Sequence, residues 1–163
     1  MTEPIQFLNL PDVEPVQYER NFIDTAVCEL KFPIILDWEN KPPAAIQKEL
    51  RRDYPYHNIV HSIGVGFQQK ESEERVALHL QSKNKKWTVA IKSDSITLDT
   101  KSYLNFEDFS NKLEKIVNVV KDKIDSDFFT RVGLRYINVI NFSPDEFEEL
   151  INQDLVAPIL KNV

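Results

Sequence analysis

Cysteine and glycine are scarce in this sequence. Among 163 residues there is one cysteine, Cys28, and there are three glycines, Gly64, Gly66 and Gly133. One cysteine excludes an internal disulfide and a metal site built from cysteine alone, and it suits a reducing compartment. The glycines are not spaced as a phosphate-cradling loop requires, which excludes P-loop and Rossmann nucleotide binding. We expect no cofactor.

A basic surface and long apolar runs are lacking as well. The 20 lysines and arginines are outnumbered by 26 acids, which gives a net charge of -6. A surface of that sign repels nucleic-acid backbones and anionic lipids. No apolar run approaches the roughly 18 residues that span a bilayer, and none forms the core of a signal peptide, about 7–15 residues long. We therefore expect a cytoplasmic protein that binds neither nucleic acid nor membrane.

The length and composition indicate one globular domain. With 42% hydrophobic and 28% charged residues, a chain of this size buries roughly two thirds of its unfolded surface in one core. Residues 1–21 contain Pro4, Pro11 and Pro15 without any periodic pattern, which predicts an irregular leader. The expected domain covers residues 22–142, and an acidic helix is expected within 143–163.

Alternating apolar residues predict the strands. They occur at 25–32, 57–68, 75–82, 86–92 and 95–100, and a long β-rich segment follows at 129–142. Because the middle segments are joined by short polar loops, we expect antiparallel neighbours. The buried side of these segments should carry Val76, Leu78, Leu80, Trp87, Val89, Ile91, Ile96 and Leu98.

Helical spacing of apolar residues predicts the helices. A short helix is expected at 43–53 after two prolines, and a long one at 106–124 with Asn105 as its N-cap. The order β-α-β-β-β-β-α-β-α indicates an α+β fold, with a mostly antiparallel sheet of five to six strands and helices packed on one face. The long helix should cover the sheet through Phe109, Leu113, Ile116 and Val120, which face Leu78, Leu80, Val89 and Ile91.

The sequence gives little support for a metal site or a catalytic nucleophile. His61 and His79 are expected on opposite faces of their strands, and His57 and His61 are four residues apart on a strand, which does not match the one-turn spacing of a helical zinc site. Cys28 alternates with apolar residues and is expected to be a core thiol. We expect no metal site and no catalytic residue.

Four lysines surround Trp87 and resemble a basic patch with a stacking aromatic ring. They are Lys83, Lys85, Lys86 and Lys92. Lysines at a hairpin tip more often form a solvated loop that protects a sheet edge, and we favour that interpretation.

The segment from Thr130 to Asn138 is the densest feature of the chain. Strand alternation places Arg131, Gly133 and Arg135 on one face, so two guanidinium groups could flank a glycine-lined hollow and clamp a carboxylate or phosphate. The alternative is internal pairing with Glu29, Asp99 or acids of the leader. Either interpretation places Val132, Leu134, Tyr136 and Asn138 on the other, apolar side.

The C-terminal helix is expected to be a partner-binding element. Its apolar stripe consists of Phe147, Leu150, Ile151 and Leu155, and its other face is acidic. Such a stripe has to be buried against something, either within the chain or in a partner.

Several segments together resemble an uncharacterised, sporadically distributed prokaryotic protein family. They are Val27-Cys28-Glu29-Leu30-Lys31-Phe32-Pro33, Trp87-Thr88-Val89, Leu98-Asp99-Thr100 with Tyr103, Phe106-Glu107-Asp108-Phe109 and Arg131-Val132-Gly133-Leu134-Arg135-Tyr136-Ile137-Asn138. The resemblance covers about Phe22 to Leu160, and Phe106 stands where the family has Trp. It implies no activity, cofactor or catalytic residue. Family members continue into a second β-rich part, so the chain resembles their N-terminal part. Their patchy distribution implies an accessory role, such as in defence or mobile elements.

The sequence favours a non-catalytic protein-interaction or regulatory module. Its partner would be another protein or a C-terminal half of the kind that the family has, and a homo-oligomer is a further possibility. The alternative is a small-molecule anion-binding or phosphate-binding domain, or an enzyme, that uses Arg131 and Arg135 as a clamp.

Overall fold

The computed structural model describes residues 21–39, 41–64, 73–141 and 152. Of the expected leader only Asn21 belongs to these ranges, and of the C-terminal helix only Asn152. The predictions for Phe147, Leu150, Ile151 and Leu155 therefore concern residues outside the described part of the chain.

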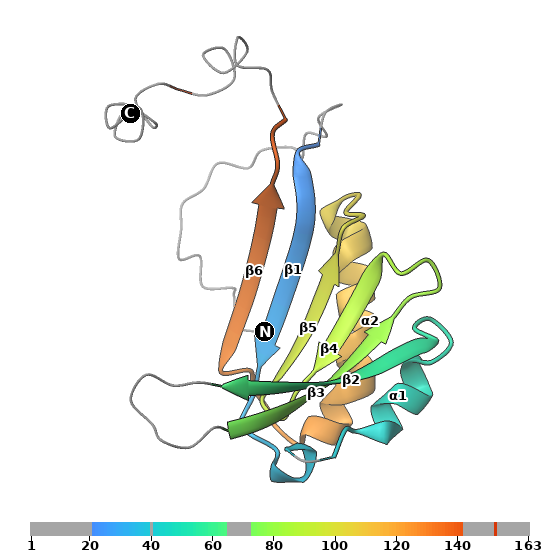
Figure 1. Ribbon diagram of the computed structural model, residues 1–163, viewed down its shortest axis with the longest axis vertical. Coiled ribbons are helices and arrows are strands. Elements are labelled where there is room, and N and C mark those ends of the chain that lie inside the picture. The colour runs from blue at the N-terminus through green and yellow to red at the C-terminus, as the bar shows by residue number, and fades with distance from the viewer. Residues whose placement is uncertain (1–20, 40, 65–72, 142–151, 153–163) are drawn as a thin grey trace, which may run out of the picture.

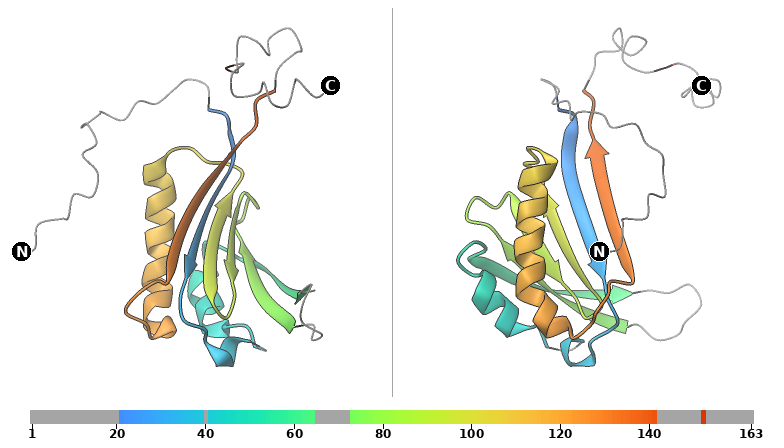
Figure 2. Two further views of the ribbon diagram at one scale, coloured as in Figure 1. Left: turned by 90° about the vertical axis from the view of Figure 1, so that its left-hand side faces the viewer. Right: turned by 180° about the vertical axis from the view of Figure 1, so that it is seen from behind.

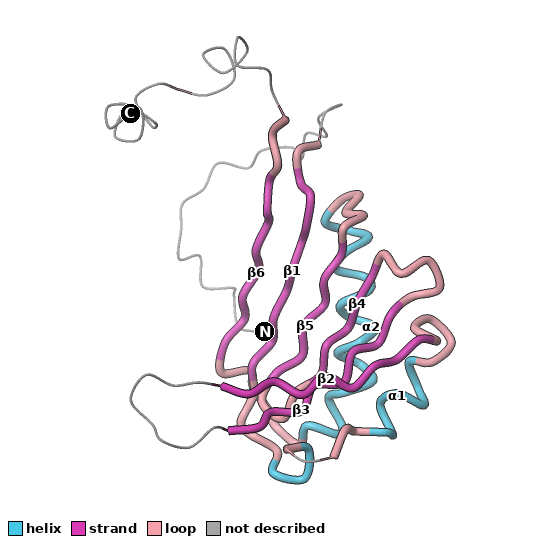
Figure 3. Tube along the Cα trace, in the orientation of Figure 1, coloured by secondary structure: helices cyan, strands magenta, loops and turns pink. Residues whose placement is uncertain are grey.

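Six strands form one antiparallel sheet in the order β2-β3-β4-β5-β1-β6 (Figure 1). The strands β2 to β5 follow one another as a meander, whereas β1 and β6 come from distant parts of the sequence and lie side by side (Figure 3). This arrangement confirms the predicted α+β class. The bounds are β1 Ile23–Lys31, β2 Tyr56–Gly64, β3 Glu73–Gln81, β4 Trp87–Ile91, β5 Ser95–Thr100 and β6 Arg131–Asn138.

Two α-helices, α1 (Ala44–Leu50) and α2 (Phe106–Ile124), lie on one face of the sheet (Figure 2). A short 3-10 helix, η1, covers Leu36–Trp38. The predicted bounds of α2 are confirmed. Its N-cap Asn105 accepts a hydrogen bond from the backbone N–H of Asp108 at 2.8 Å. The helix α1 is shorter than the predicted 43–53, because residues 51–53 form a turn before Pro55.

One core lies between the helices and the middle strands. It contains Leu78, Leu80, Val89 and Ile91 from the sheet together with Phe109, Ile116 and Val120 from α2. Leu113 is partly buried against the same cluster. The expected packing of α2 on the sheet is therefore confirmed. The layer is completed by Ala26, Cys28 and Leu30 on the buried face of β1 and by Phe32 directly after the strand.

The helix layer is narrower than the sheet. Six strands at a spacing of about 4.8 Å make a sheet about 24 Å wide, whereas two helices about 10 Å across cover about 20 Å. Two ion pairs link the first helix and the turn after it to α2. Glu49 of α1 pairs with Lys123 at 2.6 Å, and Asp53 in the turn after α1 pairs with Lys115 at 2.7 Å. Apolar residues on both edge strands are left partly in solvent, as shown by Ile59 on β2 and Leu134 on β6.

Candidate functional site

The predicted clamp residues lie on β6, the edge strand next to β1. The register pairs Arg131 with Lys31, Gly133 with Glu29 and Arg135 with Val27. Gly133 is therefore beside an acid, and the two arginines flank it on the same face of the sheet. This face is the one opposite the helices, because the core residues Cys28 and Leu30 pair with Leu134 and Val132.

Arg131 is bound by an acid of the neighbouring strand. Its Nη2 donates to Oε2 of Glu29, and the two side chains form an ion pair. A Cβ atom placed on Gly133 would lie 3.9 Å from the same Nη2, so the guanidinium group passes directly beside the glycine. The space over Gly133 is thus bordered by the ion pair between Arg131 and Glu29. Of the two alternatives for Arg131, internal pairing with Glu29 is the one observed.

Arg135 is exposed and, among the residues that the structure describes, has no ion pair. Glu29 is the diagonal neighbour of Arg135 across β1 and β6, but it is paired with Arg131. The other candidate acid within the described residues is Asp99, which pairs with Val27 on the other side of β1. Two strand spacings, about 10 Å, separate Arg135 from Asp99, and the branched side chain of Val27 lies between them. The structure therefore brings Arg131 to an internal acid and leaves Arg135 as the available cation.

The sequence analysis identified the apolar side of β6 but did not predict that this side is exposed. Val132, Leu134 and Tyr136 face the helix side, yet they are 65%, 46% and 36% exposed. Tyr136 contacts Tyr103, with the ring centroids 5.2 Å apart and the hydroxyl oxygens at 3.4 Å. Partial burial, together with the hydrogen bond to Tyr136, raises the pKa of Tyr103 to about 12. We define Val132, Leu134 and Tyr136 as the apolar row of β6.

The backbone of the apolar row points away from β1. The N–H of Phe32 donates to Asp94, on the β5 side of β1, so by alternation Lys31, Glu29 and Val27 direct their backbone groups toward β6. Their register partners are Arg131, Gly133 and Arg135. The intervening residues of β6 therefore present their N–H and C=O groups to the outer edge, where no other described strand pairs with them.

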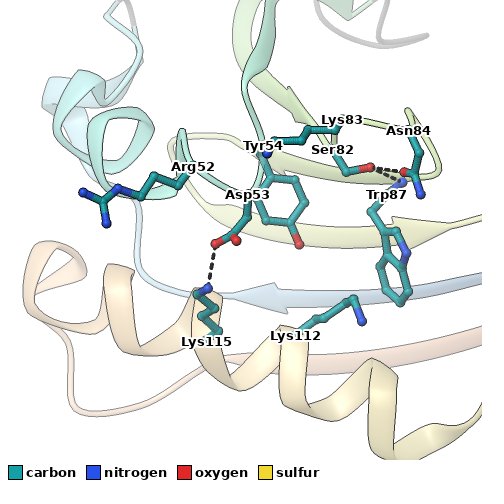
Figure 4. A pocket seen from close by; sticks show the side chains of 9 residues that line it. All are labelled: Arg52, Asp53, Tyr54, Ser82, Lys83, Asn84, Trp87, Lys112 and Lys115. Atoms are coloured by element: carbon teal, nitrogen blue, oxygen red, sulfur yellow. Dashed lines mark hydrogen bonds and ion pairs between the residues drawn. The ribbon is translucent and has the colours of Figure 1, made fainter.

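A separate hollow of about 600 Å³ lies between the β3–β4 hairpin, the turn after α1 and the middle of α2 (Figure 4). Tyr54 stands between the Asp53–Lys115 ion pair and Trp87, while Arg52 extends away from the others (Figure 4). The lining residues are Arg52, Asp53, Tyr54, Ser82, Lys83, Asn84, Trp87, Lys112 and Lys115.

Two of the four cations in this hollow are engaged by acids. Lys112 pairs with Asp108 and lies 4.7 Å from the centroid of the Trp87 ring, and Lys115 pairs with Asp53. Burial, together with Asp53 and Asp108, raises the pKa of Tyr54 to about 12, so its hydroxyl stays protonated at neutral pH. The two exposed cations that remain are Arg52, which extends away from the others, and Lys83 at the rim (Figure 4).

The lysine-rich hairpin does not present Trp87 as a stacking platform. Trp87 is buried and packs on Phe109, with the ring centroids 5.8 Å apart. Lys85 instead lies over the ring of Tyr56, at 5.6 Å from its centroid.

The histidines and Cys28 lie as the alternation predicted. His79 pairs with Asn58, so it shares a face with the even residues of β2, whereas His57 and His61 lie on the other face. Among the described residues, no group of three or more potential metal-binding side chains gathers. Cys28 is buried, and burial raises the pKa of its thiol. Within the described ranges, no helix has the length and apolarity to cross a membrane.

No family model, curated protein or solved structure matches this chain. The resemblance to the sporadically distributed prokaryotic family therefore stays a prediction. The function has to be argued from the geometry of β6 and of the hollow.

Proposed function

We propose that this chain is a non-catalytic, cytoplasmic protein-interaction module that takes up a partner strand along the outer edge of β6. The observation that carries the proposal is the apolar row, in which exposed side chains and outward backbone groups belong to the same residues. In strand addition, backbone hydrogen bonds supply affinity and alternate side chains supply specificity. Both components are present at this edge.

The distribution of charge on β6 supports this proposal. Sheet edges are commonly protected by charged residues, which interrupt an apolar surface and discourage pairing. On β6 the two charges, Arg131 and Arg135, lie on the face opposite the apolar row. From Val132 to Tyr136 the apolar row is therefore continuous, and an exposed apolar edge of this kind favours an additional strand.

The test compares three forms of the full chain as immobilised bait. These are the wild type, Leu134→Asp and the matched control Ile59→Asp, since Ile59 on the opposite edge is 44% exposed and Leu134 is 46% exposed. The prey is an extract of the source cells supplemented with untagged copies of the chain. We expect the same protein to be retained by the wild type and by Ile59→Asp and to be lost with Leu134→Asp. Equal retention by all three baits, or retention by none, would contradict strand addition at β6.

An anion-binding function is the second candidate, and the basic lining of the hollow favours it. With Arg131 paired to Glu29, a clamp of two arginines is replaced by two separate cations, Arg135 on β6 and Lys83 at the rim of the hollow. A thermal-shift screen with nucleotides and sugar phosphates tests this candidate, because a ligand that binds only the folded state raises the melting temperature. A shift that Lys83→Gln removes and Arg135→Gln retains would assign the ligand to the hollow. The reverse result would assign it to β6.

A further inference from the structure

We propose that the strand added to β6 is β6 of a second copy of this chain, paired antiparallel about a two-fold axis at Leu134. This inference rests on the proposed function, since it names the partner of the same edge. Symmetric pairing of identical surfaces is the commonest form of protein dimer. What makes β6 suitable is that its backbone, its charges and its apolar residues all favour the same register.

The backbone of β6 determines which residues can be central. In an antiparallel pair, directly opposed residues that exchange both hydrogen bonds must direct their N–H and C=O groups toward each other. On the outer edge of β6 those residues are Val132, Leu134 and Tyr136. A two-fold axis at Leu134 places Leu134 opposite Leu134 of the second copy and Val132 opposite its Tyr136. All three outward residues then find a partner.

The charges exclude the neighbouring registers. An axis at Gly133 would place Arg131 opposite Arg135 of the second copy, and an axis at Arg135 would place two Arg135 side chains opposite each other. Like charges directly opposed across strands are destabilising. With the axis at Leu134, Arg135 faces Gly133 of the second copy and Arg131 faces its Ile137. No two arginines are then directly opposed.

This register also aligns Arg135 of the second copy with Glu29 in one cross-strand row. Glu29 and Gly133 are neighbours across β1 and β6, so Arg135 of the second copy extends the same row and reaches Glu29 across the glycine. Glu29 keeps 24% of its side chain exposed while it binds Arg131. Within one copy, Glu29 is the diagonal neighbour of both Arg131 and Arg135, and it pairs with Arg131. In the dimer, Gly133 offers no side chain that would block Arg135 of the second copy from the same carboxylate. Each Glu29 would then lie between two guanidinium groups of opposite copies.

The apolar side of the pair is complementary as well. Val132 meets Tyr136 twice, and a β-branched residue opposite an aromatic one is a favourable cross-strand pair, worth roughly 0.2–1 kcal/mol. The two Leu134 side chains meet at the axis. The apolar rows of both copies, each exposed in the single chain, thereby cover one another.

The first experiment measures the association state of the full chain by sedimentation equilibrium, for the wild type, Leu134→Asp and the control Ile59→Asp. We expect the wild type and Ile59→Asp to form the same dimer. Leu134→Asp should weaken it at least tenfold, because the axis then brings two carboxylates together. Thermal melts under conditions where each variant is monomeric verify that Leu134→Asp, a change at a half-exposed position, keeps the fold.

The second experiment tests the register by cysteine cross-linking, for which the buried Cys28 gives no background. Directly opposed residues of a hydrogen-bonded pair have Cα atoms about 5.5 Å apart, within the range of a disulfide. Leu134→Cys should therefore form a disulfide-linked dimer on mild oxidation. Val132→Cys alone should form none, because its two copies are four residues apart along the pair, about 14 Å. Val132→Cys mixed with Tyr136→Cys should cross-link.

The possible results separate this inference from the proposed function. A wild-type chain that stays monomeric at 100 µM, while its capture of another protein depends on Leu134, overturns the dimer and leaves strand addition in place. Cross-linking of Val132→Cys to itself overturns the register. If Ile59→Asp and Leu134→Asp both abolish association, β6 pairs with β2 of the next copy in an open array, and the two-fold dimer is wrong.

Discussion

Arg131 reaches Glu29 alongside Gly133, the residue whose register partner is Glu29 itself. A Cβ atom on Gly133 would stand 3.9 Å from the guanidinium Nη2 and 3.9 Å from the carbonyl oxygen of Glu29. Both are ordinary contact distances, so the glycine is not required to make room for the ion pair. The pair is mostly exposed on the arginine side, and exposed pairs contribute about 0–1 kcal/mol.

Gly133→Ala should therefore be tolerated by the fold. No glycine of the described residues has a positive φ, and the added methyl group meets no atom closer than 3.9 Å. We expect the free energy of unfolding to rise by about 0.4–1 kcal/mol, because alanine restricts the unfolded chain more than glycine does. Urea unfolding in the monomeric Leu134→Asp background measures the change without a contribution from dimerisation. A loss above about 2 kcal/mol would show that the backbone at Gly133 needs a glycine.

Ile116→Ala should destabilise the protein strongly, by about 2–5 kcal/mol, because Ile116 is fully buried on the core-facing side of α2 and its truncation leaves a cavity. Leu113→Ala removes a similar group from a partly buried position on the same helix and should cost less. Both losses are measured by urea unfolding. Equal losses would mean that Leu113 contributes to the core as fully as Ile116.

Asp99→Asn should stabilise the protein near neutral pH. Burial raises the pKa of the Asp99 carboxyl above its ordinary value of 3.8, while His79 and Lys101 partly oppose the shift. Between these two pKa values the folded state binds more protons than the unfolded state, so its stability falls as the pH rises through this window. Below the ordinary value of 3.8 both states are protonated, and the advantage of the amide should disappear.

The measurement for Asp99 is the free energy of unfolding of both forms from pH 3 to pH 7. Glu114→Gln, at an exposed position on α2, is the control for the loss of one negative charge. A stability difference between Asp99→Asn and wild type that is constant across this range would contradict the role of the half-buried Asp99 carboxyl.

Cys28 should react with a thiol reagent only after unfolding. It is 3% exposed, and burial raises the pKa of its thiol, so the reactive thiolate is both scarce and shielded. Ellman's reagent applied with and without guanidinium chloride measures this protection. Val132→Cys provides the comparison, since its added thiol at a 65% exposed position should react at once in the Leu134→Asp background. Rapid reaction of Cys28 in the native chain would mean that β1 opens readily.

The alternation and spacing of apolar residues determined the local structure by themselves. They predicted α2 from Phe106 to Ile124 with its cap at Asn105, and they assigned Arg131 and Val132 to opposite faces of a strand. The faces follow from the periods of a helix and a strand, which are 3.6 and 2 residues. The start of α2 follows from one local hydrogen bond, the one that the N-cap Asn105 accepts. The buried set of the middle strands was predictable for the same reason.

Only the tertiary structure decided what surrounds β6. Its place beside β1, the pairing of Arg131 with Glu29 and the separation of Arg135 from Asp99 depend on strand order, which joins segments about 100 residues apart. The exposure of Val132 and Leu134 depends on how far two helices extend across six strands. An alternating pattern specifies which face a side chain occupies. Whether that face is covered depends on how the helix layer packs on the sheet, and the sequence of a single segment does not determine this.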